Sequence, residues 1–400
     1  MSAHERTAPG VPDRVAYIDG LRGIAALSVL AYHATHYFCK GLTPAHPAVF
    51  FFRLGTYGVD LFFVLSGFCL AYPFLRKGEA IDLVRFASRR VVRIVPPYYA
   101  AIAVLGLALL LGGAIPNVSD LITQALFLDR GGQFWSVTFW TLPVEIRWYF
   151  LFPLVLWLWT VSPRAFFVVG AAAIVAFQLT TAGALDLYAL PAFMLGIVAA
   201  DLALNHTVPK RTIACWSIGL LALALVLDWF VGPQRVYPPI AGADVRDAFP
   251  PLRILWQFTA FAFVLFAASS RTLRGLLSLR PLAFIGTASY SIYLIHVPVV
   301  QAVHVHLNQF GPIVESVLSA AFGIGAGVVF WRIFEYPLTE TALKNVAIGT
   351  VQPYVARAFV WLRLPSVIPL QRRESFAIVR APETTPATLE SPPKVVATLN

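Results

Sequence analysis

The first apolar segment, IDGLRGIAALSVLAYHATHYF from residue 18 onward, carries an arginine and a histidine at a helical spacing. Arg22 and His33 are eleven positions apart, which is about three helical turns and about 16 Å along a helix axis, so both lie on one face. An imidazole exchanges protons near neutral pH, and a guanidinium group binds anions. Asp19 precedes Arg22 by about one turn and could pair with it. The pattern favours acid–base chemistry at His33 and an anion near Arg22. The alternative is that the charged ends reach the membrane interface and a neighbouring helix satisfies the histidine.

Two carboxylates lie inside other apolar segments and are candidates to assist His33. Glu145, in FWSVTFWTLPVEIRWYFLFPL, could orient the imidazole and stabilise its cation. Asp60, in GVDLFFVLSGF, is a candidate for the same role or for binding a substrate. The alternative for both residues is a carboxylate solvated at the edge of its apolar segment. The residues alone leave this choice open.

Four arginines stand close together in VRFASRRVVRIVPPYY, and they are Arg85, Arg89, Arg90 and Arg93. Cations at this density repel one another unless an anion lies among them, and the planar guanidinium group suits phosphate. The alternative is that the arginines mark the cytoplasmic face of a membrane and contact lipid headgroups. Both interpretations, a phosphate site and a membrane boundary, fit the spacing.

The composition places these residues in a membrane protein. The chain has 400 residues, of which 58% are hydrophobic and 12% are charged, whereas soluble domains carry about 25% charged residues. The net charge of +10 comes from basic residues in short gaps between apolar runs, without a nucleic-acid motif, which excludes nucleic acid as the partner. The isolated Cys39, Cys69 and Cys215 exclude a disulfide framework and a zinc site, so no metal centre is predicted.

A membrane-spanning helix needs about 20 largely apolar residues. We therefore predict an all-α polytopic membrane protein of about ten transmembrane helices. The predicted segments lie near 19–38, 56–75, 94–112, 139–160, 165–182, 185–203, 213–231, 253–270, 283–306 and 313–335.

The distribution of lysine and arginine predicts the orientation in the membrane. One set of alternate loops holds twelve basic residues, from Arg76 to Arg280, and the opposite set holds six. The richer set faces the cytoplasm by the positive-inside rule, and an even number of spans places both termini there. We expect a cytoplasmic segment at 1–14, a membrane domain at 15–340 and a largely disordered cytoplasmic tail at 341–400, in which residues 354–370 favour a membrane-surface segment.

Five pieces of the chain, in order, resemble the acyltransferase 3 family of membrane O-acyltransferases. They are Arg22 and His33 in DGLRGIAALSVLAYH, then GVDLFFVLSGF, then Arg90 and Arg93 before Pro96, then Trp140, Glu145, Phe150 and Pro153, and finally SYSIYLIH. The resemblance covers about residues 15–340. Arg147 and Trp148 depart from the polar residue and Phe that members usually have there, and these 400 residues contain no SGNH-type domain, which some members carry.

The resemblance implies a multi-pass protein of the bacterial cytoplasmic membrane that transfers an acyl group, typically acetyl, from cytoplasmic acyl-CoA to a hydroxyl group. The implied acceptor is a carbohydrate or a lipid-linked glycan, and no cofactor is permanently bound. We assign His33, Glu145 and Asp60 to catalysis and Arg22, Arg90, Arg93 and Asp19 to donor binding. A transporter or flippase of a glycan precursor is the alternative, because charges inside many spans suit it as well.

Overall fold

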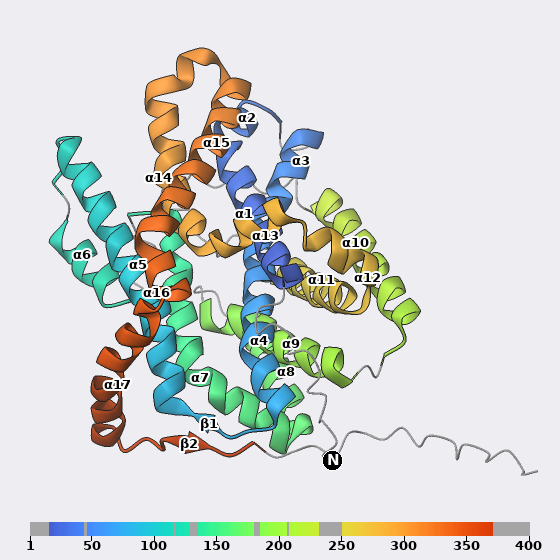
Figure 1. Cartoon of the computed structure of the whole chain (residues 1–400). Coiled ribbons are helices and arrows are strands. Elements are labelled where there is room, and N and C mark those ends of the chain that lie inside the picture. Colours follow the sequence, from blue (N-terminus) through green and yellow to red (C-terminus); the bar gives the residue numbers. More distant parts are fainter. Residues whose placement is uncertain are drawn as a thin grey trace, which may run out of the picture.

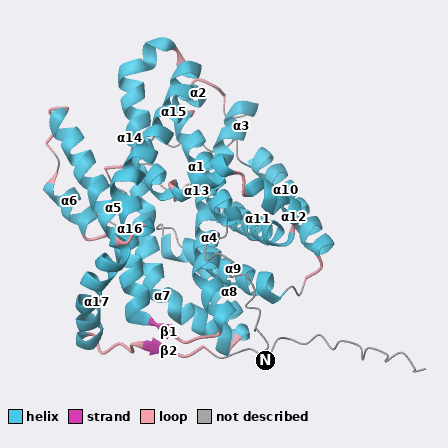
Figure 2. Cartoon of the chain, viewed as in Figure 1, coloured by secondary structure: helices cyan, strands magenta, loops and turns pink. Residues whose placement is uncertain are grey.

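The structure is a computed structural model that describes residues 16–43, 46–115, 117–128, 135–179, 185–205, 208–231 and 250–370. Figures 1 and 2 show a bundle made almost entirely of helices, with one small antiparallel strand pair. Each predicted apolar segment coincides with a helical region within these ranges. The helices are α1 (Ala16–Ala34), α4 (Gly58–Lys77), α5 (Leu83–Leu111), α7 (Thr141–Val161), α8 (Pro163–Leu179), α9 (Leu185–Asn205), α10 (Lys210–Val231), α11 (Pro250–Ser269), α13 (Arg280–Thr287) with α14 (Ser289–Leu307), and α15 (Pro312–Phe330).

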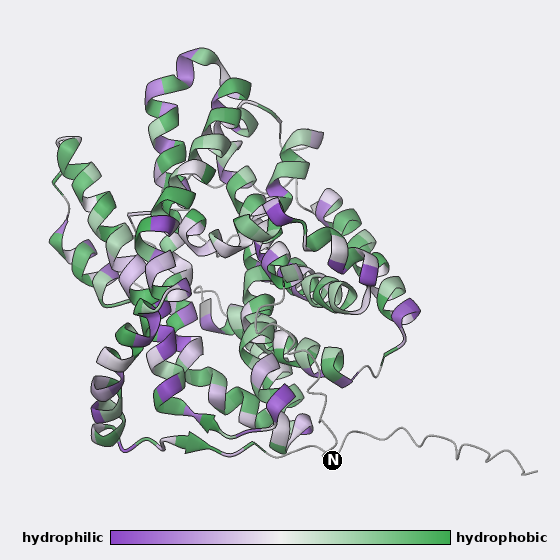
Figure 3. Cartoon of the chain, in the orientation of Figure 1, coloured by the Kyte–Doolittle hydropathy of each residue, from purple (hydrophilic) through white to green (hydrophobic). Residues whose placement is uncertain are grey.

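The prediction of an all-α polytopic membrane protein is confirmed. Seven helices of the described chain are long and apolar enough to cross a membrane, and the bent pair α13–α14 makes an eighth if it is one span. The exact number of ten crossings is not established, because α8 is shorter and α1 carries Asp19, Arg22 and His33. Figure 3 shows that hydrophobic residues predominate along most helices, and many large apolar side chains are exposed, as contact with lipid requires.

Helix α1 is shielded by protein on many sides. It packs against α4, α13, α14 and α15 and against the turn η1 (Leu54–Tyr57). A Cβ atom at Gly55 would lie 2.1 Å from the Ser28 carbonyl oxygen, and one at Gly286 would lie 1.7 Å from that of Asp19. Only glycine permits such close helix packing. The polar side chains of α1 therefore face other helices, which makes them tolerable inside a membrane.

Two of the predicted segments differ in shape from a simple span. Helix α5 begins at Leu83 rather than near 94 and runs through Pro96 and Pro97, so the four arginines belong to the helix itself. The segment predicted at 283–306 breaks between α13 and α14 with a bend of 76°. This break places Ser289 at the start of a helix beside Arg22.

The chain beyond α15 continues as a helical extension. A π-helical turn at Trp331–Glu335 (η6) leads into α16 (Tyr336–Glu340) and α17 (Leu343–Trp361), and α17 packs along α5 (Figure 1). Strand β2 (Val367–Ile368) pairs with β1 (Ile81–Asp82). The predicted membrane-surface segment at 354–370 thus packs on the start of α5, and residues 371–400 of the predicted tail lie outside the described residues.

Shorter elements complete the bundle. They are α2 (His36–Lys40), α3 (Pro47–Arg53), α6 (Val118–Ala125), η2 (Val137–Trp140), α12 (Arg271–Leu277) and η5 (Asn308–Phe310).

Candidate active site

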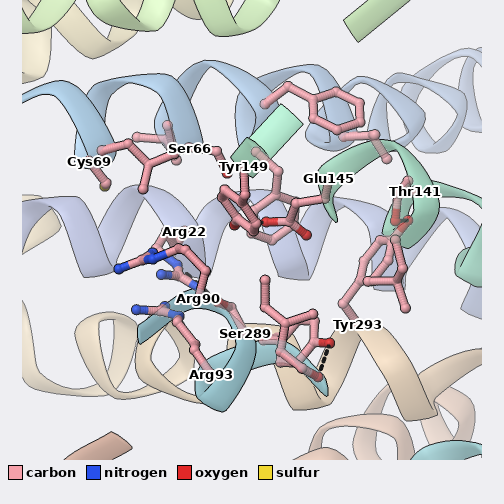
Figure 4. Close-up of a pocket in the computed structure, with 18 residues that line it drawn as sticks. Arg22, Ser66, Cys69, Arg90, Arg93, Thr141, Glu145, Tyr149, Ser289 and Tyr293 are labelled. Atoms are coloured by element: carbon pink, nitrogen blue, oxygen red, sulfur yellow. Dashed lines mark hydrogen bonds between the residues drawn. The ribbon is translucent and has the colours of Figure 1, made fainter. Parts of the chain in front are cut away.

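A pocket of about 100 Å³ lies where five helices meet, and it contains four of the predicted site residues. Helix α1 contributes Arg22, α5 contributes Arg90 and Arg93, and α7 contributes Glu145. Helices α4 and α14 supply the remaining walls, with α4 presenting mainly apolar side chains. Figure 4 shows the three guanidinium groups together at one end, Glu145 near the middle, and Thr141 and Tyr293 at the other end.

The arginines converge because of their helical positions. Arg90 and Arg93 are three residues apart on α5 and therefore share a face, whereas Arg85 and Arg89 are exposed. The Arg22 Nε donates a hydrogen bond to the Ser289 Oγ at 3.2 Å.

None of the three pocket arginines forms an ion pair with a carboxylate in the part of the chain that the structure describes. The Arg90 Nε is buried and has no hydrogen-bond partner among these residues. Its guanidinium group lies 5.7 Å from the Tyr149 ring centroid. The pocket therefore presents cations that can bind an anionic ligand.

Glu145 lines this pocket one helical turn before Tyr149, whose hydroxyl donates a hydrogen bond to the Glu145 carboxylate. Arg147, two residues further on, faces another direction and pairs with Asp186 of α9 at 2.9 Å. This divergence is the one expected for residues two positions apart on a helix. Glu145 is thus held within the pocket rather than paired with the nearest arginine in the sequence.

The start of α14 adds pocket residues that the sequence analysis did not assign. Ser289, Tyr290 and Tyr293 line the pocket, and Tyr293 accepts a hydrogen bond from the Thr141 Oγ1 at 3.1 Å. Their only sequence signal is the run of hydroxyl side chains in SYSIYLIH. Hydrogen bonds between helices account for much of this polarity, since Tyr290 donates to the Ile94 carbonyl oxygen at 3.1 Å.

A buried carboxylate, Glu335, lies behind the arginines and was also missed. Ser291 donates a hydrogen bond to it at 2.6 Å, and the side chain is 2% exposed. Glu335 forms no ion pair with Arg93 or Arg22 in the described part of the structure. Glu335 ends the π-helical turn η6, and such turns frequently occur at functional sites.

His33 lies outside the pocket lining, next to a second histidine. Its ring centroid is 5.2 Å from that of His296 on α14, and the His296 ring is 6.0 Å from the ring of Tyr293. Tyr293 itself lines the pocket. Ring contacts through His296 and Tyr293 therefore link His33 to the arginine pocket.

Asp60 and Asp19 do not line the pocket. Asp60 is fully buried, pairs with Arg253 at 2.8 Å and accepts hydrogen bonds from Tyr188 at 2.6 Å and Gln257 at 3.3 Å. Asp19 lies on α1, where its backbone packs against Gly286. Of the seven predicted site residues, Arg22, Arg90, Arg93 and Glu145 are brought together, His33 lies nearby, and the two aspartates lie elsewhere.

A larger and almost entirely apolar pocket of about 390 Å³ adjoins the first. The two pockets share Arg90, Ile94 and Tyr149. Its outer wall includes Phe359 and Ile368 from the C-terminal extension. A ligand with both a charged and an apolar part could therefore occupy the combined space.

A fold of many apolar helices around a buried cationic pocket defines an integral membrane protein with an internal binding site. The profile of an acyltransferase domain matches residues 15–332. The chain belongs to the acyltransferase 3 family. The resemblance seen in the sequence is thereby confirmed.

Curated relatives are similar to this chain at low identity. Peptidoglycan O-acetyltransferase OatA of Listeria monocytogenes is 25% identical over 87% of this chain and 59% of its own length. O-acetyltransferase OatA of Staphylococcus aureus is 25% identical over 88% of this chain and 62% of its own length. Nodulation protein 10 of Rhizobium leguminosarum is 26% identical over 82% of this chain and 94% of its own length. The chain thus spans about three fifths of the OatA relatives, and no solved structure matches it.

Proposed function

We propose that this protein is a membrane-embedded O-acetyltransferase that uses cytoplasmic acetyl-CoA as its donor. The observation that carries the proposal is the convergence of Arg22, Arg90 and Arg93 without an ion-pairing carboxylate among the described residues. An anion stabilises cations confined in this way, and the phosphates of CoA suit guanidinium groups. The names of the OatA relatives support acetyl as the transferred group and oxygen as its acceptor.

His33 is the proposed general base. The pantetheine arm would extend from the arginines toward His33, which lies about 16 Å from Arg22 by helical rise. His33 takes the proton of the acceptor hydroxyl while the oxygen attacks the thioester carbonyl carbon. The carbon–sulfur bond then breaks, and His33 returns the proton to the thiolate, so the products are an ester and free CoA. Glu145, inside the pocket, is proposed to bind the reacting end of a substrate by hydrogen bonding.

The proposed acceptor is a carbohydrate or a lipid-linked glycan. The printed name of the Listeria relative, a peptidoglycan O-acetyltransferase, supports a glycan. The apolar pocket beside Arg90 suits the hydrocarbon part of a lipid-linked acceptor. The excess of basic residues in one set of loops supports cytoplasmic termini and entry of the donor from the cytoplasm. The proposed location is the inner membrane of a bacterium.

Acetyl transfer by the purified protein tests this function. The protein in detergent is incubated with radiolabelled acetyl-CoA and one acceptor at a time. The acceptor is a peptidoglycan fragment in one reaction and a lipid-linked oligosaccharide in the other. We expect an alkali-labile labelled ester on one of the acceptors. The variant His33→Ala should lower kcat by about 10²- to 10⁴-fold, as loss of a general base does.

The matched control is His306→Ala, which removes an exposed histidine of α14. This variant should keep wild-type turnover. Near wild-type turnover in His33→Ala would show that another group serves as the base. Absence of ester formation by the wild-type protein with either glycan would contradict the proposed acceptor class.

A further inference from the structure

His296 has one ring nitrogen fixed by its own helix. Its Nδ1 lies 3.0 Å from the carbonyl oxygens of both Ile292 and Tyr293. A carbonyl oxygen only accepts hydrogen bonds, so Nδ1 must carry the proton in the neutral ring. The other nitrogen, Nε2, is consequently an unprotonated acceptor. The tautomer of His296 therefore follows from the backbone of α14.

The Nε2 atom of His296 has no partner in the described part of the structure. The side chain is 1% exposed, and Nε2 is buried without a hydrogen bond. Leaving such an acceptor unsatisfied costs about 1–3 kcal/mol. A buried polar atom in this condition needs a specific explanation, such as a catalytic role. The missing group must be a hydrogen-bond donor, because Nε2 can only accept.

The imidazole of His33 is a nearby ring that can supply such a donor. The two ring centroids are 5.2 Å apart with the planes tilted by 50°, and no hydrogen bond joins them in this state. The hydrogen bond requires a rotation of the His33 side chain that brings a ring nitrogen to about 3 Å from the His296 Nε2. When His33 accepts a proton, both of its nitrogens become donors.

We infer that His296 positions His33 by accepting a hydrogen bond from the His33 imidazolium through Nε2. The inference rests on the proposed function, in which His33 is the general base. The bond is strongest when His33 carries the proton of the acceptor hydroxyl, because charge-assisted hydrogen bonds are stronger than neutral ones. It therefore stabilises the transition state more than the ground state, which accelerates transfer. The proton stays on His33 until it passes to the CoA thiolate.

Two variants of His296 separate this role from simple packing. His296→Asn keeps an N–H donor near the position of Nδ1 but has no atom at Nε2. It should lower kcat by about 10- to 100-fold, the equivalent of one hydrogen bond to a charged group, while the KM for acetyl-CoA stays unchanged. His296→Gln places an amide oxygen near the position of Nε2 and should recover part of that loss. A change in kcat without a change in KM identifies an interaction made in the transition state.

Other outcomes count against the inference. Wild-type kcat in His296→Asn overturns it, and so does a loss in His296→Gln as large as that in His296→Asn. If His33→Ala is inactive while His296→Asn is fully active, the proposed function stands and this inference alone fails. If the wild-type protein transfers no acetyl group, the proposed function fails first.

A measurement on the unmodified protein does not depend on how the variants fold. Nitrogen-15 NMR of the wild-type protein labelled on histidine reports which ring nitrogen of His296 carries the proton. We expect Nδ1 to be protonated and Nε2 to be free in the resting protein. Protonated Nε2 with free Nδ1 would overturn the inference.

Discussion

Two groups of largely enclosed arginines in this protein have opposite surroundings. Arg253 pairs with Asp60 at 2.8 Å, and Arg53 pairs with Asp228 at 2.6 Å. Tyr188 and Gln257 complete the shell of Asp60, and Tyr57 donates a hydrogen bond to Asp228 at 2.6 Å. In the pocket, by contrast, three arginines share one side of a cavity and pair with no described carboxylate.

The difference separates structural charge from charge that is available to a ligand. A buried cation with a full set of partners is neutralised within the fold and has little left to offer a substrate. Cations left without counter-ions in a membrane protein mark a functional site, since their burial is costly. We therefore propose a structural role for Asp60 and a donor-binding role for the pocket arginines.

The largest effect on stability is expected from Asp60→Ala. Removal of this carboxylate leaves Arg253 buried without its ion-pair partner, which typically costs about 3–5 kcal/mol. The melting temperature in detergent, measured by size-exclusion chromatography after heating, should fall sharply.

The double variant Asp60→Leu with Arg253→Met is the control for this prediction. It removes both charges together, so it should be more stable than Asp60→Ala alone. An Asp60→Ala protein that melts like the wild type and loses only activity would place Asp60 in the catalytic site instead.

The smallest effect is expected from Arg147→Ala. Arg147 and Asp186 form an ion pair whose side chains are 37% and 46% exposed. Exposed pairs of this kind contribute about 0–1 kcal/mol. Melting temperature and acetyl transfer should both stay close to wild type. A large loss of transfer with an unchanged melting temperature would show that the arginine beside Glu145 belongs to the site after all.

Local properties of the sequence predicted most of the fold. Each of the ten apolar segments contains a helix. These helices were predictable because the length and apolarity of a span can be judged from about 20 consecutive residues. The 76° bend between α13 and α14 was not predicted, since the segment is apolar on both sides of it. The start of α5 at Leu83 was missed because the predicted segment followed the apolar run, which begins only after Arg93. Packing against α7 and α17 supports a longer helix.

The candidate site was predictable in residue type but not in pairing. Charged residues inside apolar segments identified Arg22, Arg90, Arg93 and Glu145, which the fold brings together. The same reasoning could not distinguish Asp60 from the residues that line the pocket, because its partner Arg253 lies 193 positions away in the sequence. Glu335 was recognisable only from contacts between distant helices. His296 ends the SYSIYLIH piece, but only its contact with His33 suggests a role for it.

The most direct test of the distinction between the two arginine groups is CoA binding by isothermal titration calorimetry. The double variant Arg90→Gln with Arg93→Gln is compared with Arg89→Gln, which removes an exposed arginine from the same helix. The pocket variant should raise the Kd for CoA by about 10- to 100-fold, the loss of one or more hydrogen bonds to a charged group. Arg89→Gln should bind like the wild type, and pantetheine, which lacks the phosphates, should not discriminate between the proteins. Equal CoA affinity in the pocket variant and the wild type would contradict the account.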